Sequence, residues 1–279
     1  MKKILITGGA GLLAPWLLAH DGNEYEVVST SRQEEEYPCD LADKGAVRKL
    51  LLGTKPDIVV HAAALTDVEG CERDEEAAEV ANHRTTANIA SSLPADTRLI
   101  YISTDQVYPN TTGVHCEGTE APENVYGRSK LAGEKVALTH PNSIALRTSF
   151  FGRSQTPGRH SLSDFIIDSL GANKEITIFD DILFTPLHAT TLATMIFVLA
   201  TSDLTGSYNL CSRNGFSKAK FALKIASHLG LQTETATVGQ STTQSGRAAR
   251  ALDLRMDPTK LETALGCKMP TLQQEIEKL

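Results

Sequence analysis

A tyrosine and a lysine four residues apart, Tyr126 and Lys130, have the types and the spacing needed for acid–base chemistry. This spacing places both side chains on one face of a helix. An ammonium beside a phenol lowers the pKa of the phenol, so that its hydroxyl becomes an acid or base near neutral pH. Thr104 and Asp105 directly follow a predicted strand at 98–103, and ligands bind beyond such strand ends in open α/β sheets. These residues predict an active site; loop capping is the alternative role of Thr104.

A glycine-rich turn follows the first apolar run of the chain. Gly8, Gly11 and Leu12 lie in a G-x-x-G-x-x-A pattern that ends at Ala14, between a strand predicted for residues 3–7 and a helix. Small residues let the backbone turn tightly and approach a pyrophosphate at the N-terminus of the next helix. The pattern therefore predicts a dinucleotide site, and a glycine turn without a ligand is the alternative.

The end of the second predicted strand, residues 25–30, indicates which dinucleotide is bound. A carboxylate there would hold the ribose 2′-hydroxyl of NAD, whereas an arginine suits the 2′-phosphate of NADP. Residues 28–31 contain no carboxylate and Arg32 follows them. The sequence thus favours NADP(H), with NAD(H) as the second choice. Three glutamates at 34–36 could neutralise Arg32, which would then be an ordinary surface residue.

Short β-branched runs alternate with helical stretches through the first half of the chain. We predict strands at 3–7, 25–30, 57–61, 98–103 and 143–147, and helices at 12–19, 44–52, 75–91 and 125–137. Strands that are apolar on both faces and separated by helices predict a parallel sheet covered on both sides. We therefore expect a doubly wound α/β fold. The pattern loosens after residue 151, with further strands at 175–179 and 207–210, and helices at 162–170, 191–200 and from Ser217 to Gly230.

Composition excludes several classes of partner. The 279 residues contain 27 lysines and arginines against 34 acids, a net charge of −7 that argues against nucleic acid. The apolar runs are too short for a membrane span or an export signal. Five scattered cysteines fit a reduced, cytoplasmic protein, and no residue cluster indicates a metal. We expect structural roles for His61 and His188, and a solvated helix face for the acidic stretch at 69–79.

Together, these motifs resemble an extended short-chain dehydrogenase/reductase, and the dTDP-4-dehydrorhamnose reductase family in particular. The resemblance covers nearly the whole chain. The matching segments are TGGAGLLA from Thr7, DL from Asp40, KPDIVVHAAALTDVEGCE from Lys55, ISTDQVY from Ile102, VYGRSKLAGE from Val125, LRTSFFG from Leu146, TPLHATTLA from Thr185, GSYNL from Gly206, FSKAKFALKIA from Phe216 and RALDLRMDPTKL from Arg250.

The resemblance implies a Rossmann-type fold and NADPH-dependent reduction of the C4 ketone of a nucleotide-linked 4-keto-6-deoxy sugar. Residues 1–150 would form the NADP(H)-binding domain, and residues 151–279 a smaller substrate-binding lobe that exchanges elements with it. Thr104, Tyr126 and Lys130 would be the catalytic triad: Tyr126 donates the proton, Lys130 holds the nicotinamide ribose and depresses the tyrosine pKa, and Thr104 hydrogen-bonds the carbonyl oxygen. A homodimer through helices of the first domain is a further implication.

The remaining site residues form two expected sets. The cofactor set contains Gly8, Gly11, Leu12, Arg32, Asp40, Leu41, Ala62, Ala63 and Ala64 beside Tyr126 and Lys130. The substrate set contains Thr66, Val68, Thr104, Asp105, Phe150 and, for the diphosphate, Arg250.

The chain also departs from the family pattern on the substrate side. Phe150 replaces a tryptophan, Leu187 a threonine and Ala251 a proline, and the loop between Tyr108 and Tyr126 is shorter. These departures leave the particular sugar and nucleotide open. Two other functions remain: a nucleotide-sugar epimerase or dehydratase of the same fold, and a non-catalytic NADP-binding subunit like the regulatory subunit of methionine adenosyltransferase.

Overall fold

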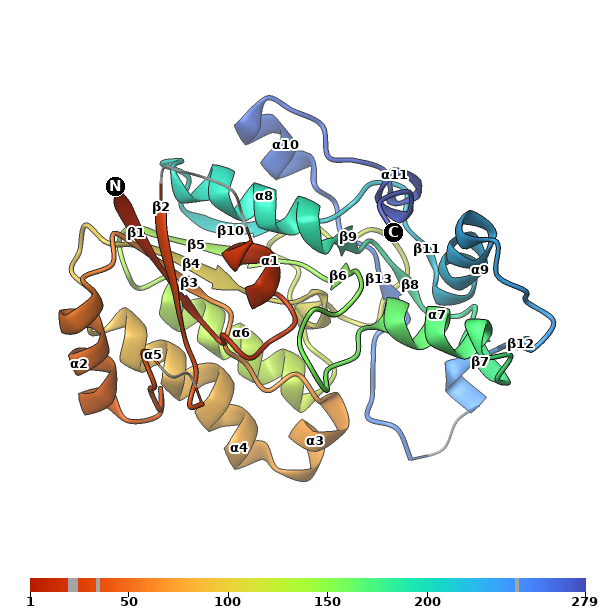
Figure 1. Ribbon diagram of the computed structural model, residues 1–279, viewed down its shortest axis with the longest axis horizontal. Coiled ribbons are helices and arrows are strands. Elements are labelled where there is room, and N and C mark those ends of the chain that lie inside the picture. The colour runs from red at the N-terminus through yellow and green to blue at the C-terminus, as the bar shows by residue number, and fades with distance from the viewer. Residues whose placement is uncertain (20–24, 34–35, 244–245) are drawn as a thin grey trace.

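The computed structural model (Figure 1) describes residues 1–19, 25–33, 36–243 and 246–279. Its central sheet consists of six parallel strands, in the spatial order β10-β5-β4-β3-β1-β2. The strands are β1 (Lys2–Thr7), β2 (Tyr25–Thr30), β3 (Ile58–His61), β4 (Arg98–Ile102), β5 (Ser143–Arg147) and β10 (Gly206–Asn209). The predicted doubly wound parallel sheet is thereby confirmed. The strand order reverses between β1 and β3, because β2 lies on one side of β1 and β3 on the other.

Helices cover both faces of this sheet, which explains why its strands are apolar throughout. One face packs against α2 (Lys44–Thr54), α5 (Thr85–Ala90) and α6 (Val125–Ala137), and the other against α1 (Ala14–Leu18) and α8 (Ala189–Ala200). Alternate residues of β1 serve the two layers: Ile4 and Ile6 point to α1 and α8, while Leu5 points to α2. The sheet edge beyond these strands carries the predicted motifs.

The helix predicted for residues 75–91 is wrong in one respect, because it is interrupted. It consists of α4 (Glu75–Glu79), a π-helical turn η1 (Val80–Arg84) and α5. The side chain of Asn82, in the π turn, receives the N–H of Leu65 at 2.8 Å and donates to the carbonyl of Leu65 at 3.0 Å. The π turn therefore places this amide against the segment after β3, at the carboxyl ends of the strands.

The second half of the chain contributes to both parts of the molecule. Helix α8, strand β10 and helix α10 (Thr259–Leu265) pack with the first sheet, whereas most other elements build a separate core around Phe151, Phe184 and Phe221. These elements are β7 (Ile176–Phe179) paired with β12 (Ala236–Gly239), the small sheet β11 (Phe216–Ser217), β8 (Leu183–Phe184) and β13 (Asp253–Leu254), and the helices α7 (Leu162–Gly171), α9 (Lys218–Leu229) and α11 (Leu272–Ile276). We refer to them as the C-terminal lobe.

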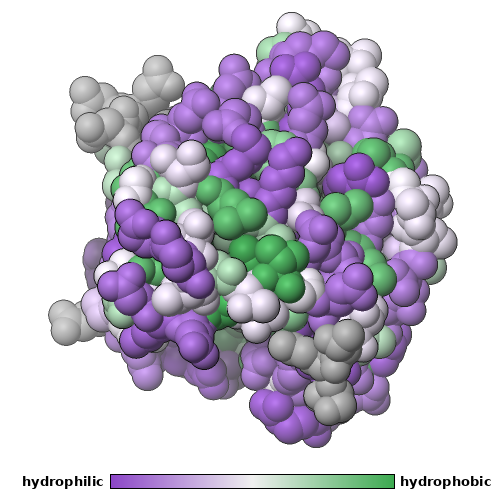
Figure 2. Space-filling model, turned by 90° about the vertical axis from the view of Figure 1, so that its right-hand side faces the viewer, coloured by the Kyte–Doolittle hydropathy of each residue, from purple (hydrophilic) through white to green (hydrophobic). Residues whose placement is uncertain are grey.

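The C-terminal lobe presents some apolar side chains to solvent. Figure 2 views the molecule from the side of this lobe and shows apolar residues among polar ones. Phe165 on α7, Leu223 on α9 and Val238 on β12 are its exposed large apolar side chains among the described residues. No helix in the described part of the chain is long and apolar enough to cross a membrane.

Helix α6 lies unusually close to the π turn, and this closeness predicts an effect on stability. A Cβ atom at Gly133 would lie 2.1 Å from the carbonyl oxygen of Asn82 and 2.6 Å from the hydroxyl of Tyr101. Gly133→Ala should therefore destabilise the fold by about 1–3 kcal/mol, measured by urea unfolding. Gly53→Ala in α2 is the matched control, because nothing lies within 4 Å of its Cβ position, and it should be neutral or stabilising. Equal unfolding midpoints for the two variants would contradict this account of the helix contact.

Candidate active site

A sharp glycine turn joins β1 to α1 at the point where the strand order reverses. Gly8 has a φ of +83°, and a Cβ atom there would lie 2.9 Å from the backbone of Ala63, so glycine is required. The N–H groups of Gly8 and Gly9 both donate to the carbonyl of Thr30 at 3.0 Å. The turn is thus fastened to β2 and packed on the segment after β3, at the edge where such sheets bind ligands.

The same turn carries backbone donors that fit the diphosphate of a dinucleotide. Gly11 donates to the carbonyl of Gly8 at 2.8 Å, which tightens the turn. The N–H groups of Leu12 and Leu13 have no acceptor in the described part of the chain. Unpaired N–H groups ahead of a helix attract anions. Among the expected residues, Leu12 therefore offers its N–H to an anion, whereas Gly8 and Gly11 shape the turn through their own hydrogen bonds.

Three residues of the expected cofactor set gather where β2 ends. Arg32 is exposed directly after the strand. The N–H of Cys39 donates to the carbonyl of Ser31 at 3.0 Å, which brings Asp40 and the buried Leu41 back to the same place. Glu34 and Glu35, named above as neutralising groups, lie outside the described residues.

A chain of hydrogen bonds beneath the turn fixes His61, the last residue of β3. The hydroxyl of Thr86 gives its proton to the carbonyl of Asn82, so it accepts from Nε2 of His61 at 3.0 Å. Nδ1 of His61 then accepts from the hydroxyl of Thr7 at 2.7 Å. Burial, together with the charge of Lys130, lowers the pKa of His61 to about 3. The imidazole is neutral and structural, as the sequence predicted.

The segment after β3, residues 62–65, lies beside the glycine turn. Residues 62–64 are partly exposed. The N–H of Ala63 donates to the hydroxyl of Thr7 at 3.2 Å. Leu65 is clamped by the side chain of Asn82. Hydrogen bonds to the Thr7 hydroxyl and the Asn82 side chain therefore hold the three alanines of the expected cofactor set at the carboxyl ends of the strands.

The expected triad gathers at the carboxyl end of β4. Thr104 follows the strand and caps the short 3-10 helix η2 (Asp105–Val107). Tyr126 and Lys130 lie one turn apart on α6, and all three side chains are buried. A side-chain hydrogen bond joins Tyr126 to Thr104. The ammonium of Lys130 donates to the carbonyl of Ile102 at 2.6 Å. One strand end and one helix face thus position all three groups.

Burial governs the charge states of the tyrosine and the lysine. It raises the pKa of Tyr126 well above its ordinary value, although the hydrogen bond with Thr104 acts in the other direction. It also lowers the pKa of Lys130 to about 7, with Glu134 opposing the change. The sequence predicted that the ammonium would depress the tyrosine pKa. That expectation is wrong for this structure, because loss of hydration dominates at both groups.

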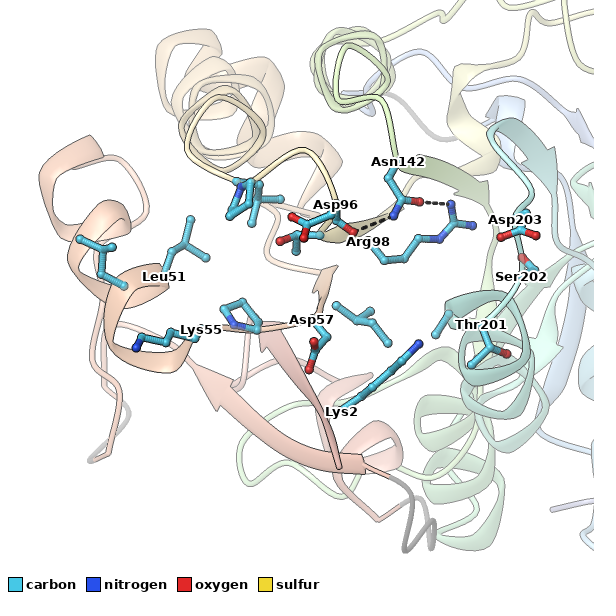
Figure 3. Close-up of a pocket in the computed structure, with 17 residues that line it drawn as sticks. Lys2, Leu51, Lys55, Asp57, Asp96, Arg98, Asn142, Thr201, Ser202 and Asp203 are labelled. Carbon is cyan, nitrogen blue, oxygen red and sulfur yellow. Dashed lines mark hydrogen bonds between the residues drawn. The ribbon is translucent and has the colours of Figure 1, made fainter.

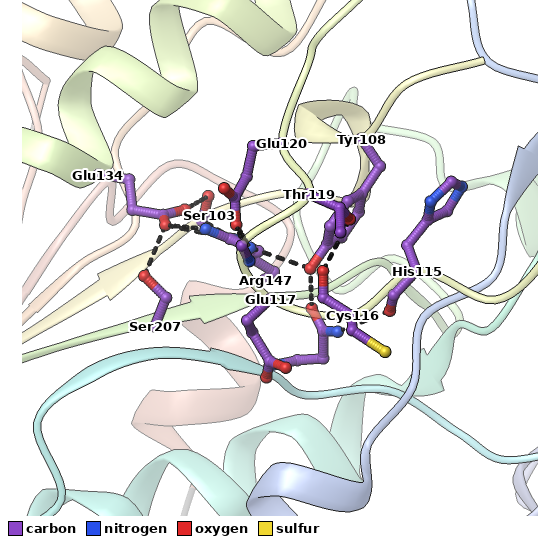
Figure 4. Close-up of polar contacts among 12 residues, drawn as sticks. Ser103, Tyr108, His115, Cys116, Glu117, Thr119, Glu120, Glu134, Arg147 and Ser207 are labelled. Atoms are coloured by element: carbon purple, nitrogen blue, oxygen red, sulfur yellow. Dashed lines mark hydrogen bonds and ion pairs between the residues drawn. The ribbon is translucent and has the colours of Figure 1, made fainter. Parts of the chain in front are cut away.

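A buried ion-pair network supports α6 behind the triad (Figure 4). The guanidinium of Arg147, at the end of β5, donates to the carboxylate of Glu134 on α6, with a shortest distance of 2.5 Å. Glu134 also accepts the hydroxyls of Ser103 and Ser207, both at 2.7 Å. Arg147 reaches Glu120 as well. The sequence analysis assigned no role to Glu134. Its position four residues after Lys130 could have indicated that it lies on the same face of α6.

Two further side chains fix the N-terminus of α6. The carboxylate of Glu72 accepts the N–H of Val125 at 2.7 Å. Asn124 accepts the N–H of Gly127 at 2.8 Å and donates to the carbonyl of Ala249 at 2.9 Å. The sequence analysis did not single out Asn124, which links the triad helix to the C-terminal lobe.

The expected sugar-binding residues lie around the triad with different degrees of exposure. Thr66 is exposed before α3 (Val68–Arg73), and Val68 packs against the cluster that includes Tyr126. Asp105 is buried beside Thr104, and burial raises the pKa of its carboxyl. Phe150 lies in β6 (Phe150–Phe151).

The two family departures Phe150 and Leu187 are neighbours in the structure. Strand β6 pairs in parallel with β9 (Leu187–His188), and Phe150 lies opposite Leu187 in the register. Ala251, the third departure, is buried in the core of the C-terminal lobe.

Arg250 is paired with a carboxylate of the first domain. It donates to both oxygens of Glu69 on α3, at 2.7 and 2.6 Å, and this contact lowers the pKa of Glu69. The expectation that residues 69–79 form only a solvated face is therefore wrong for Glu69, and also for Glu72. A bidentate pair joins the two parts of the molecule beside the triad.

A cavity of about 500 Å³ lies away from this site (Figure 3). Its lining includes Lys2, Asp57, Arg98 and Asn142, which lie at the amino ends of β1, β3, β4 and β5. The guanidinium of Arg98 donates to the side chain of Asn142 at 3.0 Å. Because the triad lies at the opposite ends of the strands, this cavity is not part of the candidate active site.

Comparisons with known proteins agree with this arrangement. A protein called probable low-salt glycan biosynthesis reductase Agl14, from Haloferax volcanii, is 30% identical over 98% of this chain and 96% of its own length. The dTDP-4-dehydrorhamnose reductase of Sinorhizobium fredii is 28% identical over 99% of this chain and 96% of its own. A crystal structure of dTDP-4-dehydrorhamnose reductase from Bacillus anthracis, in complex with NADP, superposes with a TM-score of 0.90 at 26% identity, covering 100% of this chain and 98% of that one.

The match extends to a family model. The model described as the RmlD substrate binding domain covers residues 1–279, the whole length of the sequence. The chain therefore belongs to the RmlD substrate-binding domain family.

Proposed function

We propose that this protein is an oxidoreductase that uses NADPH to reduce the C4 ketone of a nucleotide-linked 4-keto-6-deoxy sugar. The observation that carries the proposal is the gathering of Thr104, Tyr126 and Lys130 at one sheet edge with the glycine turn. Relatives named dTDP-4-dehydrorhamnose reductase support it.

Tyr126 is suited to donate a proton in this reaction. The chemistry that NADPH would supply when bound is hydride transfer to the carbonyl carbon, which would leave the oxygen in need of a proton. Tyr126 carries its proton at neutral pH, since a phenol has an ordinary pKa of about 10 and burial raises it further. A developing alkoxide is basic enough to take that proton. Thr104 would donate a hydrogen bond to the same oxygen, and Lys130 would hold the nicotinamide ribose.

NADP(H) is the cofactor that the exposed Arg32 favours, with NAD(H) as the second choice. An arginine at the end of β2 suits a 2′-phosphate. The NADP in the related Bacillus anthracis structure supports this choice. Asp40 and Leu41 would contact the adenine, and residues 62–64 would lie under the cofactor.

On the substrate side, Thr66, Val68, Asp105 and Phe150 would contact the sugar, and Arg250 the diphosphate. The dehydratase, epimerase and regulatory-subunit alternatives receive less support. The intact triad argues against a non-catalytic subunit, and β2 ends without the carboxylate that NAD-recycling epimerases and dehydratases favour. A cytoplasmic location, a homodimer and the domain boundary at residue 150 remain predictions from the sequence.

Replacement of the proton donor tests the proposal directly. Purified protein with NADPH and an enzymatically made dTDP-4-keto-6-deoxy sugar should lose absorbance at the nicotinamide band. Tyr126→Phe should reduce this rate at least about 100-fold while NADPH still binds, because general acid catalysis contributes about 10²–10⁴-fold. Tyr208→Phe, on β10, is the matched control and should keep the rate. Tight NADPH binding without oxidation by any 4-keto sugar would instead support the regulatory subunit.

Arg32→Ala tests the cofactor preference. Loss of a charge-assisted contact to the 2′-phosphate should weaken NADPH binding about 10-fold or more and leave NADH binding nearly unchanged. Fluorescence titration with each cofactor measures both constants. Arg48→Ala, an exposed change on α2, is the control. If the affinities for NADPH and NADH fall equally, Arg32 does not bind the 2′-phosphate.

Lys130 predicts a pH dependence of stability in the cofactor-free protein. The folded protein releases this proton near pH 7, whereas the unfolded chain keeps it up to its ordinary value of 10.5. The unfolded state thus binds more protons between these values, so wild-type stability rises with pH across that window. Lys130→Met lacks the titrating group and therefore this rise. The free energy of unfolding of the variant minus that of the wild type should accordingly fall from pH 7 to pH 10 in urea unfolding. The exposed Lys135→Met should show no such trend, and a flat Lys130→Met difference would contradict the charge assignment.

A further inference from the structure

Lys218 is a cation near the site to which the sequence analysis gave no role. It is the first residue of α9, directly after the helix cap Ser217, and its N–H donates to the carbonyl of Ile182 at 2.9 Å. These backbone contacts fix where the side chain starts. Its ammonium lies 5.9 Å from the centre of the Phe184 ring, which forms part of the apolar core of the C-terminal lobe.

The charged groups around this ammonium come from both parts of the molecule. Asp105, beside the catalytic threonine, attracts it, whereas Arg250 and Arg247 repel it. Burial and the two arginines lower the pKa of Lys218 against the pull of Asp105. Lys218 therefore interacts electrostatically with both the carboxylate expected at the sugar and the arginine expected at the diphosphate. The small sheet β11-β8-β13 brings the two cations to one part of the lobe, since Lys218 directly follows β11 and Arg250 comes three residues before β13.

The ammonium has no hydrogen-bond acceptor in the part of the chain that the structure describes. Arg250, by contrast, is already paired with both oxygens of Glu69. A partly buried ammonium without an acceptor is unfavourable, and a bound anion would remove that penalty. Three cations against two carboxylates also make this region locally positive, although the whole chain has a net charge of −7.

We propose that Lys218 binds the sugar-side phosphate of a nucleoside-diphosphate sugar, between Asp105 at the sugar and Arg250 at the other phosphate. The inference rests on the proposed function. Its chemistry is a charge-assisted hydrogen bond from the ammonium to a phosphate oxygen. Through this contact Lys218 would also fix the position of the diphosphate relative to the triad.

Calorimetric titration of the NADPH-bound protein with dTDP and dTMP tests this contact, because only dTDP carries the second phosphate. Lys218→Met should weaken dTDP binding about 10-fold or more, as expected for a hydrogen bond to a charged group, and leave dTMP binding unchanged. Lys220→Met is the matched control, since Lys220 lies on the same helix but is exposed over the Phe216 ring. Lys218→Arg should retain most of the affinity, and it replaces the methionine variant if that variant fails to bind NADPH.

Three results would overturn the inference: equal dTDP affinity in Lys218→Met and wild type, equal losses for dTDP and dTMP, or no dTDP binding by the wild type. Failure of the proposed function has a different signature. In that case the wild type binds dTDP in a Lys218-dependent way but does not oxidise NADPH with any 4-keto sugar.

Discussion

The buried pair of Arg147 and Glu134 is the interaction on which the rest of the site depends. Both side chains are almost fully buried, and loss of one partner from such a pair costs about 3–5 kcal/mol because the other charge stays buried. Glu120 is a second partner of Arg147, so the loss of Arg147 should cost more than the loss of Glu134. The pair ties β5 to α6, and through Ser103 and Ser207 it reaches the ends of β4 and the start of β10. Thr104 follows Ser103, and Lys130 lies one turn before Glu134 on α6; both belong to the proposed triad. The charge balance of the core therefore sets the spacing between the strand end and the helix that carry the chemistry.

Close packing also fixes the position of α6. Helix α6 touches the π turn at Gly133 and the 3-10 helix at Gly127, where a Cβ would lie 2.2 Å from the carbonyl of Gln106. Asn124 and Glu72 satisfy its first N–H groups. A helix restrained at its start, its middle and its buried carboxylate leaves little freedom to Tyr126 and Lys130. The proton transfer proposed for this site would require such restraint.

Local patterns in the sequence were sufficient for the sheet, because fully buried parallel strands and amphipathic helices each repeat a short signal. They were also sufficient to predict the glycine turn and the proximity of Thr104 to the Tyr126 and Lys130 pair, because these residues occur in compact motifs. They were insufficient for contacts between distant segments. Arg250 and Glu69 are 181 residues apart, and the residues next to each of them do not predict the ion pair. The π turn was missed as well, and the contact that its Asn82 makes with Leu65 is likewise non-local. The tyrosine pKa was misjudged because spacing reveals a neighbouring charge but not the loss of water around both groups.

The pairing of β6 with β9 bears on how this site could have diverged. Phe150 and Leu187 lie opposite each other, and both differ from the family pattern. Phe150 is smaller than the tryptophan of the family pattern, whereas Leu187 is larger than the threonine and is apolar. In a close-packed layer each change alone would leave a gap or an overlap, whereas the two together conserve volume. The two positions should therefore show epistasis. Relatives should change them jointly, and a route that alters the sugar pocket one residue at a time would pass through a poorly packed intermediate.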